Sequence, residues 1–132
     1  MHDRLATITQ YNDLQSEDSK AICDRLQTEI NAVLEEATSK LYHGGPAWFI
    51  EDNPVVGYWV RKSGVQLLFW SGQSFNEPDL KAEGSFKAAE KIYNDASEID
   101  EVELARWLQK ARDIQWDYKN IVKRKGELVR LR

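Results

Sequence analysis

The segment that most constrains the fold runs from residue 42 to residue 75, where short apolar runs alternate with turn residues. After a first run at 47–50, the run at 55–60 is rich in β-branched and aromatic residues, and the run at 65–70 is apolar except for Gln66. Because the turns between the runs are short, neighbouring runs can pair only as antiparallel hairpins. One antiparallel sheet is therefore predicted.

Side-chain alternation divides these strands into two faces. In the run 55–60, alternation places Val56, Tyr58 and Val60 on one face and Val55, Gly57 and Trp59 on the other. In the run 65–70, it separates Val65, Leu67 and Phe69 from Gln66, Leu68 and Trp70. Both faces of the third strand are largely apolar, which predicts that this strand is central and that each face is covered.

Two helices are predicted to pack on the sheet, after a short helix within 5–14. Ser16 is the expected N-cap of the first, and its three-four apolar stripe consists of Ile22, Leu26, Ile30, Val33, Leu34 and Ala37. The second begins at a capping box of Asp100 and Glu103 and is expected to span about 101–124. The predicted fold class is α+β, with an antiparallel sheet of about four or five strands packed against an N-terminal helix and a long C-terminal helix.

Length and composition bound the class of protein. A chain of 132 residues fits one domain, 1–132, since domains cluster at roughly 100–150 residues. The single cysteine, Cys23, cannot form an internal disulfide, which suits a reducing compartment. No stretch approaches the ~20 apolar residues of a membrane span, and no apolar run follows the N-terminus as in a secretory signal. We expect a cytoplasmic protein that does not contact a membrane.

Charge is distributed unevenly along the chain. The net charge is −4, but the segment 119–132 holds six basic residues against Glu127, so it contributes +5 and the remainder carries −9. Basic residues in the last turn of a helix complement its dipole, and a basic tail can also bind nucleic acid. The acidic remainder would repel phosphate, and Tyr118 is the only aromatic beside the tail, which argues against nucleic acid.

The order of elements and one motif resemble a known family. The box His43-Gly44-Gly45-Pro46-Ala47-Trp48-Phe49 is similar to the aromatic-Gly-x-Pro-x-aromatic box of the YdhG-like family. These are small bacterial domains of unknown function, some of which are described as frataxin-like iron chaperones. The runs 65–70 and 83–87 extend the likeness to nearly the whole chain. The resemblance implies a further strand around 87–93 and, as a possible activity, iron binding.

The aromatic residues of the strands suggest a binding site. Tryptophans on strands are most simply core residues. The functional alternative is that a face bearing several of them beside the glycine-rich turn lines a groove for a small molecule or a protein partner, or forms a homodimer patch. The residues predicted to form this site are His43, Gly44, Gly45, Trp48, Gln66 and Trp70. We rank a non-enzymatic binding module first, with a monomer or homodimer as the expected state.

Iron binding through surface carboxylates is the alternative, because oxygen ligands alone can hold iron. The candidates are Glu17, Asp18, Asp24, Glu35 and Glu36. A solvated helix face predicts the same pattern. An enzyme ranks third and a nucleic-acid binder fourth: one cysteine and two histidines, His2 and His43, lack zinc-ligand spacing, and Cys23 lacks an evident base partner.

Overall fold

The computed structural model describes residues 7–132, so the predicted start of the first helix and His2 lie outside the described residues. The helices are α1 (Ile8–Asp13), α2 (Glu17–Val33) and α3 (Glu101–Asp113), with one-turn 3₁₀ helices η1 (Gly72–Ser74) and η2 (Ala96–Glu98). The strands are β1 (Thr38–Tyr42), β2 (Gly45–Ile50), β3 (Asn53–Arg61), β4 (Gly64–Phe69), β5 (Lys81–Ala82) and β6 (Ala89–Tyr93).

The six strands form one antiparallel sheet in the order β1-β2-β3-β4-β6-β5. The α+β class is confirmed, with six strands in place of about four or five. Strand β6 confirms the strand expected around 87–93. Within residues 7–132, none of the helices is both long and apolar enough to cross a membrane.

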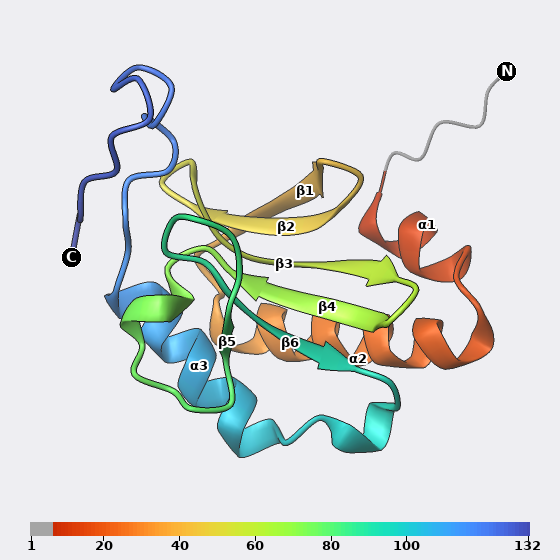
Figure 1. Ribbon diagram of the computed structural model, residues 1–132. Helices are drawn as coiled ribbons and strands as arrows, with labels where there is room; N and C mark the ends of the chain where they lie inside the picture. Colours follow the sequence, from red (N-terminus) through yellow and green to blue (C-terminus); the bar gives the residue numbers. More distant parts are fainter. Residues whose placement is uncertain (1–6) are drawn as a thin grey trace, which may run out of the picture.

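Helices α2 and α3 lie together on one side of the sheet (Figure 1) and enclose the core with it. The alternation predicted for β3 and β4 is confirmed here, because Tyr58, Leu67 and Phe69 are fully buried in the core. From α2, Leu26 and Ile30 pack into the same cluster and are also fully buried. At roughly 25 cal/mol per Å² of apolar surface removed from water, this layer supplies most of the drive to fold.

One residue departs from the predicted alternation. Val55 was assigned to the face of Trp59, yet it packs in the core beside Val56. The pairing of β2 with β3 shifts between Trp48 and Phe49, so that Trp48 faces Val56 and Phe49 faces Pro54. Val55 is the extra residue of a β-bulge, which allows it to turn inward.

Helix α2 begins as predicted, with the Ser16 side chain accepting a hydrogen bond from the Ser19 amide. Its end was predicted too late, because Leu34 is already its C-cap and Ala37 lies just before β1. Strand β1 was not predicted at all. It is an edge strand whose residues are exposed or half-buried, so its apolar pattern is weak.

The prediction of a helix over 101–124 is wrong beyond Asp113, where α3 ends. Residues 114–132 instead form a hairpin, in which the Asp117 amide donates to the Val129 carbonyl at 2.7 Å. We call this segment the C-terminal hairpin. The interpretation of the basic tail as a helix terminus is therefore also wrong. The apolar spacing of this region is helical, but contacts with β3 hold it in another conformation.

Asn53, at the start of β3, makes these contacts. Its side-chain nitrogen donates to the Trp116 carbonyl at 2.9 Å, and its side-chain oxygen accepts from the amides of Tyr118 and Lys119. In an α-helix, these carbonyl and amide groups would pair with one another. Here they bind the side chain of Asn53, which is only 1% exposed. Sequence spacing contains no signal of such a distant partner.

Candidate functional site

Five aromatic side chains gather on the side of the sheet away from α2 and α3. Phe49 and Trp59 alternate with core residues in β2 and β3, and Trp70 follows the core residue at the end of β4. Tyr42 and His43 join them from the end of β1. We call this set of Tyr42, His43, Phe49, Trp59 and Trp70 the aromatic face.

The rings contact one another across neighbouring strands, and Tyr42 at the end of β1 also reaches Trp70 at the end of β4. Ring centroids lie 6.2 Å apart for Tyr42 and Trp70, 5.8 Å for Trp59 and Trp70, and 5.2 Å for Tyr42 and Phe49. Tilted and edge-on pairs at such distances are favourable beyond the area they bury. The aromatic face is thus a continuous cluster connecting β1 to the end of β4.

Two glycines make room for this cluster. A Cβ on Gly45 would lie 2.5 Å from Cδ1 of Trp59, and a Cβ on Gly57 would lie 2.8 Å from its Cη2. The indole of Trp59 therefore lies against the backbone of β2 and β3, and its Nε1 donates to the His43 carbonyl at 3.0 Å. Gly45, predicted as a ligand contact, is a support for Trp59.

The turn before β2 positions His43 and Gly44. Their φ angles are +52° and +83°, which is the pattern of a two-residue type I′ hairpin turn. The turn leaves the His43 side chain exposed, with its ring centroid 4.1 Å from that of Tyr42. From β1, the Lys40 ammonium lies 4.8 Å from the ring centroid of Phe49.

Access to the aromatic face is uneven. Phe49 and Trp59 are each 6% exposed, whereas Tyr42 and Trp70 are half-buried and His43 is exposed. The accessible surface is therefore made of partly open rings above a closed aromatic floor. Such a surface can stack against a flat apolar group but contributes few hydrogen-bonding groups.

Gln66 was predicted as a polar group of the site. It lies opposite Trp59 in the register of β3 and β4, so it is on the correct side of the sheet. Its side chain accepts from Nε of Arg61 at 3.1 Å and donates to Glu90 at 2.7 Å. These bonds join β3, β4 and β6, and they leave Gln66 8% exposed.

Trp48 does not lie with the other predicted residues. It is fully buried on the side covered by helices, where its Nε1 donates to the side chain of Asn31 in α2 at 2.8 Å. The structure thus brings His43, Gly44, Gly45, Gln66 and Trp70 to one side of the sheet and places Trp48 in the core. Sequence reasoning did not assign Tyr42 or Phe49 to the site, although Phe49 is the last residue of the glycine-rich box and Tyr42 directly precedes it.

The predicted metal ligands are dispersed. Glu17 and Asp18 occupy the exposed first turn of α2, and Glu35 is exposed beyond its end. Asp24 pairs with Lys20, and Glu36 pairs with Arg112 of α3 at 2.6 Å. Across residues 7–132, no three or more histidine, cysteine, aspartate or glutamate side chains are grouped to hold a metal. Iron binding stays a prediction from the resemblance.

Cys23 is fully buried in the core. Burial raises the pKa of its thiol to about 12, with a further contribution from the nearby charge of Asp24. A nucleophile must be present as the thiolate, so this cysteine is a packing residue at neutral pH.

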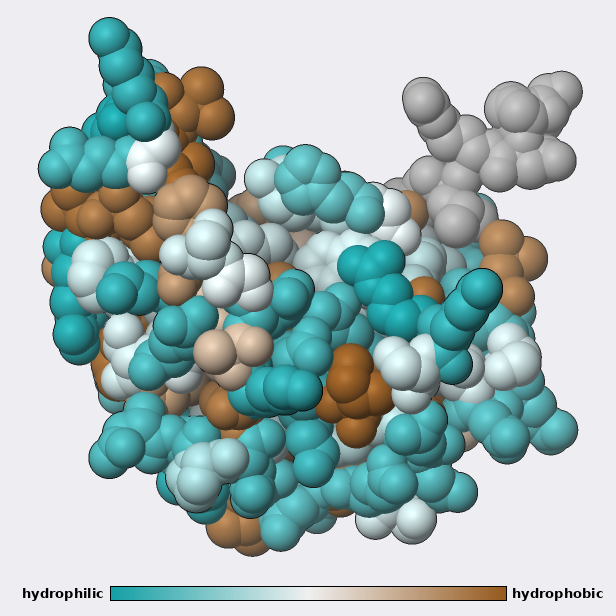
Figure 2. Space-filling view, viewed as in Figure 1, coloured by the Kyte–Doolittle hydropathy of each residue, from teal (hydrophilic) through white to brown (hydrophobic). Residues whose placement is uncertain are grey.

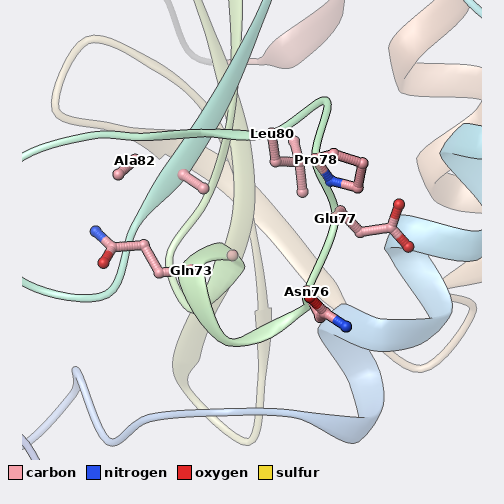
Figure 3. Close-up of a pocket in the computed structure, with 8 residues that line it drawn as sticks. Gln73, Asn76, Glu77, Pro78, Leu80 and Ala82 are labelled. Atoms are coloured by element: carbon pink, nitrogen blue, oxygen red, sulfur yellow. The ribbon is translucent and has the colours of Figure 1, made fainter.

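A cavity of about 600 Å³ lies elsewhere, between η1, the loop to β5, and β6 (Figure 3). Sequence reasoning did not find it, because it is lined by a loop that carries only the turn signals of Gly72 and Pro78. The Glu77 side chain points from the loop toward α3, where it binds Arg106 at 2.8 Å and Lys110 at 2.6 Å. Both ion pairs of Glu77 hold the loop against α3.

Comparison of the chain with protein-family models, with curated proteins and with solved structures found no match in any of the three.

Proposed function

We propose that this protein is a non-enzymatic binding module and that the aromatic face is its binding site. The observation that carries the proposal is that Tyr42 and Trp70 are partly open while resting on the buried rings of Phe49 and Trp59. Phe49 and Trp59 hold the rings of Tyr42 and Trp70 in place, so these rings need not be immobilised when a ligand binds. Preorganised aromatic surfaces of this kind favour binding because little conformational entropy is lost.

The ligand class follows from the chemistry of the rings. A planar, largely apolar group, either of a small molecule or of a protein side chain, would stack on Tyr42 and Trp70. His43 and Lys40 stand at the margin as polar groups. The YdhG-like membership is part of this proposal, and it is supported by the box at 43–49 that builds the turn and the support under Trp59.

Iron handling is not a second candidate here. The carboxylates predicted for it are spread along α2 and beyond its end, and two of them are engaged by Lys20 and Arg112.

The test uses aromatic fragments as probes, namely indole, benzoate and benzylamine, added to isotope-labelled protein. The five tryptophans give separate indole signals, which substitution to phenylalanine assigns. We expect the signals of Trp59 and Trp70 to move on titration, while those of Trp48 and Trp107 stay fixed. Trp70→Leu should weaken indole binding about tenfold, the effect of losing one stacked ring pair.

Trp116→Leu is the matched control, because Trp116 is also half-buried but belongs to the C-terminal hairpin. Equal weakening in both variants would contradict the proposal. Shifts confined to the backbone amides of Gln73 and Asn76 would place the fragments in the 600 Å³ cavity and would also contradict it.

A further inference from the structure

A different surface, the C-terminal hairpin, has a chemistry of its own. Its two arms are antiparallel and are joined by a bridge between Trp116 and Arg130. Next to this bridge, the Gln115 amide donates to the Arg132 carbonyl at 3.0 Å. In Figure 1 its loop extends beyond the end of the sheet at the upper left. The hairpin is therefore positioned to meet a partner ahead of the body of the protein.

Buried polar groups fix the shape of this hairpin. Asp117 is 1% exposed, and its carboxylate accepts from Asn120 at 2.9 Å and pairs with Arg124. Asn53 holds its base through the amides of Tyr118 and Lys119. These hydrogen bonds fix the backbone from which the side chains of the loop extend.

Basic side chains predominate on the exposed surface of the C-terminal hairpin. Lys123, Lys125 and Arg130 are all exposed, and the buried Asp117 is already matched by Arg124. The fold also brings Lys87 to this surface, with its ammonium 4.7 Å from the ring centroid of Trp116. The hairpin therefore presents concentrated positive charge on a chain that is acidic elsewhere.

Apolar side chains lie among these cations. Val122 is 86% exposed, Leu131 48% and Val129 39%. Phe86, 45% exposed, lies in the loop whose Lys87 amide donates to the Tyr118 hydroxyl at 3.0 Å. Figure 2 shows hydrophobic and hydrophilic side chains intermixed on this part of the surface.

The combination decides between classes of anionic partner. Nucleic acid would engage the cations and stack on aromatic rings. The ring of Trp116 already has Lys87 at 4.7 Å and Arg130 at 5.9 Å, which leaves Phe86 as an exposed ring beside three exposed aliphatic side chains. Exposed aliphatic side chains such as Val122 gain nothing from a phosphodiester backbone. An anionic lipid surface accepts both, since cations pair with headgroups while apolar side chains enter the boundary with the acyl chains.

We propose that the C-terminal hairpin docks on anionic lipid surfaces, which replaces the expectation from the sequence that the protein does not contact a membrane. Val122 enters the headgroup region, and Lys123, Lys125 and Arg130 pair with lipid phosphates. The contact is peripheral and reversible, and salt weakens it because it depends on charge.

The test is sedimentation of the full chain with vesicles of phosphatidylcholine alone or with about one third phosphatidylglycerol. We expect at least about tenfold tighter binding to the anionic vesicles, lost in Lys123→Glu/Lys125→Glu and reduced in Val122→Asp. The control, Lys62→Glu/Lys81→Glu, makes the same change of charge at exposed residues outside the hairpin and should bind normally.

Equal binding to both vesicles, or equal loss in the control, would overturn the proposal. So would binding of oligothymidylate without binding of vesicles, which would assign the hairpin to nucleic acid. The fragment titrations of the aromatic face in Lys123→Glu/Lys125→Glu should match the unmodified protein, because the two surfaces are independent.

Discussion

The two faces of the sheet bury aromatic side chains by different means. On the helix-covered face, Trp48 and Tyr58 are fully buried, and each polar atom reaches a helix: Trp48 Nε1 donates to Asn31, and the Tyr58 hydroxyl donates to Asn12 at 2.7 Å. On the aromatic face, the ring of Trp70 packs against Trp59, and the Trp59 indole donates to the His43 carbonyl, not to a helix. Helices close one face fully, whereas the sheet alone leaves the rings of Trp70 and Tyr42 partly open.

The difference shows what a sheet can and cannot do with its own side chains. Small residues at Gly45 and Gly57 let one indole lie flat on the backbone, and this indole becomes the floor for the next ring. Burying the remaining rings of this face would require another layer of secondary structure or a partner molecule. The face without that layer is where a partner can add apolar contacts, and this is why we place the binding site there.

Truncating one tryptophan on each face tests this difference directly. Trp48→Ala should lower the free energy of unfolding by about 3–5 kcal/mol, because it opens a cavity in the core. Trp70→Ala should cost only about 1 kcal/mol, since its ring is already partly hydrated. Urea unfolding measures both; similar losses would show that the two faces are equally closed.

A second test removes the contact that sets the C-terminal hairpin apart from α3. Asn53→Ala deletes four hydrogen bonds, to Gln115, Trp116, Tyr118 and Lys119, at a buried position. We expect a loss of about 2–4 kcal/mol. Hydrogen exchange should show faster exchange at the amides of Tyr118 and Lys119, with α2 as the internal control. Unchanged protection there would contradict the anchoring role of Asn53.

A third test addresses the glycine beneath Trp59. Gly45→Ala should cost about 1–3 kcal/mol, because its Cβ would meet both the indole and the Tyr58 carbonyl oxygen at 2.7 Å. Gly44→Ala is the control: at φ +83° it is strained, but nothing lies within 4 Å of its Cβ. In thermal unfolding, the added substitution Trp59→Leu should reduce the cost of Gly45→Ala and leave that of Gly44→Ala unchanged.

The ion pair between Glu36 and Arg112 should make a small contribution to stability that depends on pH. The ion pair with Arg112 lowers the pKa of Glu36 from 4.5 to about 2. A lowered pKa in the folded state stabilises the protein above pH 4.5, and this contribution disappears as the pH falls toward 2. Because Glu36 is 43% exposed, Glu36→Gln should cost only about 0.5 kcal/mol at pH 7. A cost that persists at pH 2 would rule out the ion pair as its source.

The sequence was informative wherever a structural feature depends on neighbouring residues. The cap at Ser16, the stripe of α2, the short hairpin turns and the alternation in β3 and β4 all follow from local spacing and turn chemistry. The presence of aromatic rings on both sides of the strands was also predicted from that alternation, because the period of a strand is two.

Tertiary structure alone decided the features that depend on distant partners. Trp48 belongs to the core because Asn31 of α2 meets its indole, and α3 stops at Asp113 because Asn53 binds the backbone that follows. The bulge at Val55 arises from the pairing of two strands. Local spacing cannot specify such contacts, since hydrogen bonds between residues far apart in the chain become available only when the fold brings them together.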